Sequence, residues 1–219
     1  MSLETAYQGP KRGADRAVLL AHGAGADMNT KALTTVADAL ADAKIPSLRF
    51  NFPYMSAGRR APDRPPVLEA AVREAAAELA ARTKLSLDQI VLAGRSMGGR
   101  ICSLVVADAN DPVPARALVL LGYPLHPPGK PDVLRTEHFP RIRVPCLFVS
   151  GTRDAFGTPD ELKRHAERIK GEVAWHWIDT GDHGFKPLKA SGVTPDAALA
   201  AVAATVVAFV GRDAVTTAR

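Results

Sequence analysis

The sequence predicts an α/β protein whose mostly parallel sheet has six to seven strands, with helices on both faces. Short apolar runs typical of buried strands alternate with helical patterns about six times along the chain. Gly-rich and polar clusters lie directly after these runs, at the strand ends that meet at one edge of a parallel sheet. The 219 residues, 47% of them hydrophobic, suit one sizeable core, so residues 1–219 are expected to form a single domain.

Continuous apolar runs define the strands of this sheet. The predicted strands are residues 17–21, 46–52, 90–93, 117–121, 146–150 and 173–178. Residues 1–16 are polar and contain Gly9, Pro10 and Gly13, so they are expected to hold at most a short edge strand.

Helical periodicity fills the segments between the strands. The predicted helices are residues 30–43, 67–84, the segment after Ser96 up to residue 109, 159–170 and 194–210. Thr194 is expected to cap the last helix, with Pro195 at its first position. Two segments rich in Pro and Gly, residues 55–66 and 122–144, are expected to form loops.

Composition argues against several classes of partner. The formal net charge is +5, from 28 Lys and Arg against 23 Asp and Glu, and no basic run interleaves with the few aromatic residues. Nucleic-acid binding is therefore not expected. The sequence shows neither a leader pattern nor an apolar run that could span a membrane, and Cys102 and Cys146 are expected to be buried free thiols. These features predict a cytoplasmic protein without a membrane partner.

A strand, a tight turn and a helix surround Ser96. Residues 90–93 lead into Gly94-Arg95-Ser96-Met97-Gly98, and a helical pattern follows. This is the context of the G-x-S-x-G nucleophile elbow, in which a strained turn lifts the Ser hydroxyl above the strand end. The simpler interpretation is an ordinary turn whose Ser caps the helix. The choice between these two interpretations depends on whether catalytic partners for Ser96 follow later strands.

Two such partners follow the last two strands. Asp154 lies in Gly151-Thr152-Arg153-Asp154 after one strand, and His183 lies in Gly181-Asp182-His183-Gly184 after the next. The order Ser96, Asp154, His183 is the order in which this elbow is completed to a catalytic triad. Asp179 and Asp182 lie closer to His183 in sequence, but a neighbouring side chain rarely points at the next imidazole. Asp154 is therefore the predicted acid.

The loop after the first strand, His22-Gly23-Ala24-Gly25, is expected to provide half of an oxyanion hole. The backbone N–H groups of Ala24 and Met97 are the predicted donors, and His22 is expected to bond backbone groups and shape the loop. A dinucleotide-binding turn fails because Met28 stands at the third glycine position. A P-loop fails because Thr30, not Gly, precedes Lys31.

Arginines border the predicted site. Arg59, Arg60 and Arg64 lie in the loop after the second strand, and Arg95 precedes Ser96. The simpler interpretation is that these arginines belong to an ordinary solvent-exposed loop. The functional alternative makes Arg59, Arg60 and Arg95 substrate-binding residues for an anionic group.

Five motifs carry a resemblance to a known family: HGAG, RFNFP, GRSMGG, SGTRDAFG and GDHGF. From about residue 17 to residue 210 the chain resembles the small, lidless branch of the α/β-hydrolase superfamily. Its expected architecture is that of dienelactone hydrolases, which have Cys where this chain has Ser96. The resemblance implies Ser96 as nucleophile, His183 as base, Asp154 as acid, and Ala24 with Met97 as oxyanion donors.

The sequence therefore predicts a serine hydrolase that cleaves a small-molecule ester without a metal or cofactor. The superfamily also contains regulatory and scaffolding members, so a non-catalytic interaction protein is the alternative. Relatives that act on long lipids carry a helical lid after the strand equivalent to residues 117–121. Here seven prolines or glycines fall between residue 122 and Arg141, so no large cap and a preference for short or polar esters are expected.

Overall fold

A computed structural model of the chain describes residues 3–212. Within them, seven strands form one sheet in the order β1-β3-β2-β4-β5-β6-β7. The strands are β1 (Thr5–Gln8), β2 (Ala17–Ala21), β3 (Ser47–Phe50), β4 (Ile90–Arg95), β5 (Ala117–Leu121), β6 (Cys146–Gly151) and β7 (Val173–Ile178). β1 runs antiparallel to β3, and every other pair is parallel. The mostly parallel sheet and the short N-terminal edge strand are both confirmed.

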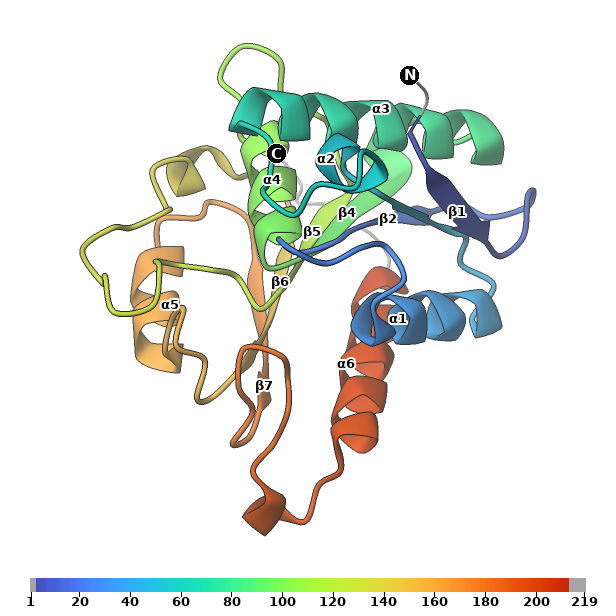
Figure 1. The fold of residues 1–219 in the computed structure, drawn as a ribbon. Helices are drawn as coiled ribbons and strands as arrows, with labels where there is room; N and C mark the ends of the chain where they lie inside the picture. The colour runs from blue at the N-terminus through green and yellow to red at the C-terminus, as the bar shows by residue number, and fades with distance from the viewer. Residues whose placement is uncertain (1–2, 213–219) are drawn as a thin grey trace.

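Helices cover both faces of this sheet (Figure 1). The helices are α1 (Lys31–Asp42), α2 (Pro53–Ser56), α3 (Pro65–Thr83), α4 (Met97–Val106), α5 (Pro159–Ala166) and α6 (Pro195–Val210), with single turns η1 (Leu87–Gln89), η2 (Phe139–Arg141) and η3 (Lys189–Ser191). Buried residues of α1 and α6 form one apolar cluster with one face of the strands, and those of α3, α4 and α5 form a second cluster with the other face. The sheet is therefore the middle layer of three.

The main differences from the predicted elements arise where the backbone contacts another segment of the chain. The predicted strand 46–52 stops at Phe50, because the Phe52 N–H donates to the His22 ring at 3.0 Å instead of to a strand. The short helix α2 then begins at Pro53, and α3 begins at Pro65, so only part of the predicted loop 55–66 is loop. Proline suits both helix starts, since the first turn needs no N–H donor.

Two predicted helices are too long. α4 ends at Val106 rather than at residue 109. α5 ends at Ala166 rather than at residue 170, and tighter turns follow it. Gly171 then passes so close to the Val144 carbonyl that a Cβ at that position would lie 2.0 Å from its oxygen. This approach requires the chain to leave the helix early.

The connection between β5 and β6 contains little regular secondary structure. Within the described residues it forms the single turn η2 and otherwise extended backbone and turns, so no cap domain lies there, as predicted. Separately, none of the helices in residues 3–212 combines the length and apolar character that crossing a bilayer requires.

Candidate active site

Ser96 sits in a strained turn between β4 and α4. Its backbone has φ 50° and ψ −115°, a conformation that a residue with a side chain rarely adopts. The Ser96 N–H donates to the Leu121 carbonyl at 2.8 Å, which ties the turn to β5. The side chain makes no capping hydrogen bond to α4, so the capping interpretation is wrong. The hydroxyl is instead free to serve another group.

Close backbone contacts make the turn dependent on glycine. A Cβ at Gly94 would lie 2.3 Å from the Gly99 nitrogen, and a Cβ at Gly98 would lie 2.5 Å from the Ala21 carbonyl oxygen. Both contacts involve backbone, which cannot rotate away as a side chain can. The two glycines therefore allow β4, α4 and the end of β2 to approach one another.

We expect Gly98→Ala to destabilise the fold by about 3 kcal/mol, because overpacking against rigid backbone is costly. For a chain of this length that is a drop in Tm of roughly 6–12 °C. Thermal unfolding followed by circular dichroism measures it. Gly23→Ala is the matched control, since its Cβ would meet ordinary contacts of 3.4 Å and beyond. Equal losses in both variants would contradict the packing argument.

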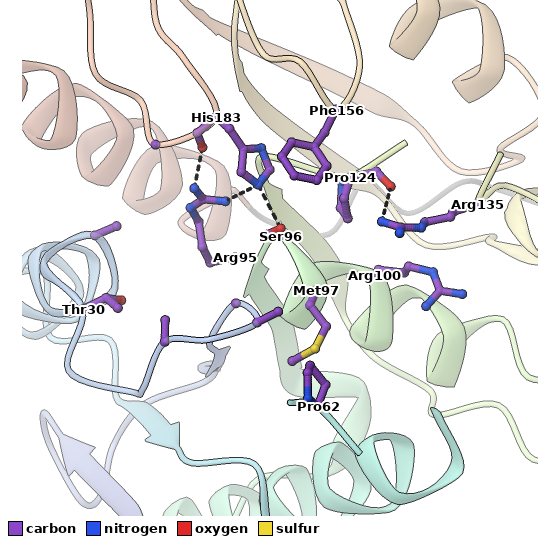
Figure 2. A pocket seen from close by; sticks show the side chains of 15 residues that line it. Thr30, Pro62, Arg95, Ser96, Met97, Arg100, Pro124, Arg135, Phe156 and His183 are labelled. Atoms are coloured by element: carbon purple, nitrogen blue, oxygen red, sulfur yellow. Dashed lines mark hydrogen bonds between the residues drawn. The ribbon is translucent and has the colours of Figure 1, made fainter. Parts of the chain in front are cut away.

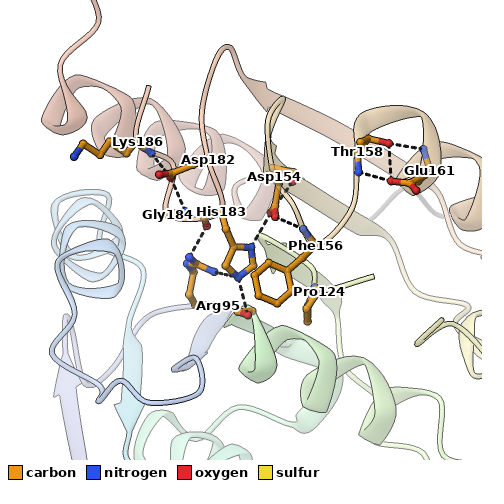
Figure 3. A network of polar contacts seen from close by, with 12 residues as sticks. Arg95, Pro124, Asp154, Phe156, Thr158, Glu161, Asp182, His183, Gly184 and Lys186 are labelled. Atoms are coloured by element: carbon orange, nitrogen blue, oxygen red, sulfur yellow. Dashed lines mark hydrogen bonds and ion pairs between the residues drawn. The ribbon is translucent and has the colours of Figure 1, made fainter. Parts of the chain in front are cut away.

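Three side chains from different loops form a hydrogen-bonded chain (Figure 3). His183, after β7, has Nδ1 2.8 Å from Asp154 Oδ2 and Nε2 2.9 Å from Ser96 Oγ. Asp154, after β6, is buried. Because a carboxylate only accepts, Nδ1 carries the proton, and a neutral ring then presents Nε2 as an acceptor to the Ser96 hydroxyl. The structure thus brings together the three residues that the sequence singled out.

The His183 loop reaches across two strands to meet Ser96. A Cβ at Gly151 would lie 2.2 Å from the Gly181 carbonyl oxygen, and one at Gly122 would lie 3.5 Å from the His183 ring. Gly122 also has φ 62°. Small residues after β5 and β6 therefore leave the space through which this loop passes.

Neighbouring groups hold Asp154 and His183 in place. Asp154 Oδ1 accepts from the Phe156 N–H at 2.8 Å, and the Phe156 ring stacks on the His183 ring with centroids 4.1 Å apart. Asp182 does not contact the ring of its neighbour. Its Oδ1 accepts from the N–H groups of Gly184 and Lys186 and so closes the turn that carries His183.

Arg95 lies against His183 rather than pointing to solvent. Its Nη1 is 3.2 Å from His183 Nε2, and its Nη2 donates to the His183 carbonyl oxygen. Burial lowers the pKa of Arg95, while the Asp154 and Asp182 carboxylates act in the opposite direction. The guanidinium also lies over the Phe185 ring at 5.2 Å from its centroid. Arg95 therefore holds the end of the His183 loop close to Ser96.

The chain is also similar to a known protein family and to solved structures. A family model described as an alpha/beta hydrolase domain matches residues 14–211. The chain belongs to this alpha/beta hydrolase family.

Solved structures share the fold of this hydrolase. A dienelactone hydrolase from Anabaena variabilis is 21% identical, with a TM-score of 0.72 over 94% of this chain and 90% of that one. An α/β serine hydrolase homologue from Coxiella burnetii is 20% identical, with a TM-score of 0.69 over 94% and 91%. A serine hydrolase without a lid from Xanthomonas campestris is 20% identical, with a TM-score of 0.68 over 96% and 91%. At these identities the similarity is one of fold.

A pocket of about 600 Å³ opens beside the Ser96 hydroxyl of the hydrolase (Figure 2). Ala24 and Met97, the predicted oxyanion donors, both line it. Met97 is the first residue of α4, where backbone N–H groups have no carbonyl partner in the helix. The loop that carries Ala24 lies against Ser96: a Cβ at Gly23 would be 3.5 Å from Ser96 Cβ.

His22 shapes that loop as the sequence predicts. Its Nδ1 bonds the Gly23 carbonyl at 2.8 Å, and its Nε2 accepts from the Phe52 N–H. Burial lowers the pKa of His22, which favours the neutral ring that can both donate and accept. The loop after β2 and the segment after β3 are thereby joined.

The predicted substrate-binding arginines are placed differently from one another. Arg95 lines the pocket, but Arg59 and Arg60 are exposed and do not belong to its lining. Arg59 instead pairs with Asp63 at 2.7 Å. Arg64, from the same loop, is the residue before α3.

Among the pocket residues that were not predicted as site residues, three have cationic or aromatic side chains: Arg100, Arg135 and Phe156. Arg100 lies four residues after Ser96, so helical spacing from the nucleophile could have revealed it. Phe156 follows Asp154 by two residues in the SGTRDAFG motif. Arg135 had no local signal, since it lies in the Pro-rich connection after β5.

Proposed function

We propose that this hydrolase cleaves small-molecule esters by acyl transfer through Ser96, with His183 as base and Asp154 as the acid that orients it. The observation that carries the proposal is the unbroken hydrogen-bonded chain from Asp154 through His183 to Ser96 Oγ at the mouth of a pocket. A nucleophile in contact with a base, and the base in contact with an orienting group, is the arrangement that activates a hydroxyl.

The reaction would proceed in two halves. Ser96 Oγ attacks the ester carbonyl as His183 Nε2 takes its proton, and the Met97 and Ala24 N–H groups stabilise the oxyanion. His183 gives the proton to the departing alcohol, which leaves an acyl group on Ser96. A water molecule then attacks this acyl group, with His183 again as base, and the carboxylic acid is released. Neither a metal nor a cofactor takes part in these steps.

A fluorophosphonate probe tests the proposal, because it forms a covalent bond with an activated serine only. We expect rapid labelling of the purified protein, with the adduct on the peptide that contains Ser96 by mass spectrometry. Hydrolysis of a panel of 4-nitrophenyl and other acyl esters should accompany labelling. A folded protein with neither labelling nor hydrolysis would favour the non-catalytic, interaction-protein alternative.

The uncovered site leads to a prediction on substrate size. Since the β5–β6 connection builds no cap, nothing encloses a long acyl chain, and acetyl and butyryl esters should have higher kcat/KM than palmitoyl esters. Kinetics across a chain-length series of 4-nitrophenyl esters, below and above the micellar concentration of the long ones, measure this. A preference for long chains that rises at the lipid interface would contradict it.

A further inference from the structure

Two arginines that the proposed reaction does not use line the pocket beside Ser96. Figure 2 shows Arg100 and Arg135 on the opposite side of Ser96 from Arg95. Both are half-buried, and Pro124, Met97 and Phe156 form apolar parts of the same lining. Cationic side chains in such a setting lose part of their hydration, and a bound anion would compensate for that loss.

Arg100 lies one helical turn after the nucleophile. The Arg100 N–H donates to the Ser96 carbonyl at 3.1 Å, which places Arg100 in the first turn of α4, about 6 Å along the helix axis from Ser96. Its Nε is buried and has no hydrogen-bond partner. A substrate group bound by Arg100 would therefore lie a short chain length away from the carbonyl under attack.

Arg135 is held in position by its own backbone. The Tyr123 hydroxyl donates to the Arg135 carbonyl at 2.6 Å, and the Arg135 N–H donates to the Leu125 carbonyl at 2.9 Å. Burial raises the pKa of Tyr123, so the phenol remains protonated as a donor. The guanidinium itself makes one long contact, from Nη1 to the Pro124 carbonyl at 3.5 Å. Most of its donors are left for a ligand, on a fixed backbone.

Within residues 3–212, neither Arg100 nor Arg135 forms an ion pair with a carboxylate. Burial and the charge of Arg100 both lower the pKa of Arg135. Glu69 is close enough to feel the charge of Arg100 without contacting it. His138, behind Arg100, has its pKa lowered to about 4, chiefly by burial, and so is neutral at physiological pH. The two arginines thus carry positive charge that Glu69 offsets only at a distance.

We propose that Arg100 and Arg135 form an anion subsite that binds a carboxylate or phosphate group of the substrate while Ser96 attacks an ester nearby. Two guanidinium forks match the oxygens of either anion, and the anion would relieve the repulsion between the two arginines. The inference rests on the proposed function for its ester and names the class of that substrate. It moves anion recognition from Arg59 and Arg60, in the exposed loop, to the pocket wall.

Matched esters provide the kinetic test. 4-Nitrophenyl hydrogen adipate carries a free carboxylate, and 4-nitrophenyl methyl adipate carries the same chain with that charge masked. After subtraction of spontaneous hydrolysis, wild type should favour the charged ester by about tenfold or more in kcat/KM, as expected for charge-assisted hydrogen bonds. Arg100→Gln and Arg135→Gln should each lower this ratio about tenfold, and Arg100→Lys should restore part of it. A general loss of activity would lower kcat/KM for both esters equally, so it would leave their ratio unchanged.

Two controls make the ratio specific. Arg164→Gln removes the same charge from an exposed residue of α5 outside the pocket and should leave the preference intact. Arg59→Gln combined with Arg60→Gln tests the exposed loop. If that double variant abolished the preference and the pocket variants did not, the subsite would have been misplaced.

Equilibrium binding separates this inference from the proposed function. Monomethyl adipate and inorganic phosphate are titrated by calorimetry into Ser96→Ala protein, with and without Arg100→Gln or Arg135→Gln. Binding that each pocket variant weakens about tenfold supports the subsite even if no ester is hydrolysed. Absent or unchanged binding, or equal kinetics for the charged and masked esters in wild type, overturns the subsite and leaves the proposed esterase activity standing.

Discussion

Replacing Ser96 with alanine should reduce ester hydrolysis by at least about 10³-fold and abolish labelling by a fluorophosphonate probe. The change removes only the hydroxyl that lies 2.9 Å from His183 Nε2. Without it the base has no nucleophile to activate, and no acyl-enzyme forms. The residual rate would come from water in the pocket and from the oxyanion donors. Single-turnover kinetics with 4-nitrophenyl acetate, together with probe labelling, measure both effects.

The fold of this variant should be preserved, because the Ser96 side chain caps no helix and the turn is held by glycines and backbone bonds. Circular dichroism and thermal unfolding check this. Ser103→Ala is the matched control: its hydroxyl lies on the same helix but bonds His138 and the Arg100 carbonyl, behind the pocket. Equal labelling of wild type and Ser96→Ala would show that another residue is the nucleophile.

The strands were the most predictable part of the fold. Residues 17–21 and 117–121 form strands with the predicted bounds, because continuous apolar runs have one way to become buried between layers of helix. The order of Ser96, Asp154 and His183 along the chain was equally informative, since each follows a parallel strand and such strand ends share an edge. Their hydrogen-bonded contact is a consequence of topology that sequence order already indicates.

Features set by contacts between distant segments were not predictable. α5 ends early because Gly171 passes the Val144 carbonyl, and no residue within the helix signals this. The place of Arg135 depends on the Tyr123 hydroxyl that holds its backbone across the Pro-rich connection. Arg59 is instead engaged by Asp63, a pairing that helical or strand periodicity does not reveal in a loop. The residues of the pocket wall could thus be identified only from the structure, whereas the strands of the sheet could be predicted from the sequence.

Asp154→Asn should lower kcat by roughly 10⁴-fold, because it reverses the protonation of the base. The Phe156 N–H donates to Oδ1, so an asparagine would keep its carbonyl oxygen there and place its NH₂ group at the Oδ2 position. That position lies 2.8 Å from His183 Nδ1, which would then have to accept. The proton would move to Nε2, and the ring could no longer take the proton of Ser96.

Asp182→Asn is the matched control for this change. The Oδ1 of Asp182 accepts from two backbone N–H groups in the turn that carries His183, and an asparagine carbonyl oxygen can accept both bonds. Its kcat should therefore fall far less than that of Asp154→Asn, and its labelling by the fluorophosphonate probe should stay close to wild type. The tautomer provides a readout that loss of structure would not mimic: ¹⁵N NMR of the His183 ring should place the proton on Nδ1 in wild type and Asp182→Asn, but on Nε2 in Asp154→Asn. If Asp182→Asn caused the larger loss, or if the proton stayed on Nδ1 in Asp154→Asn, then Asp154 would not be the residue that orients the base.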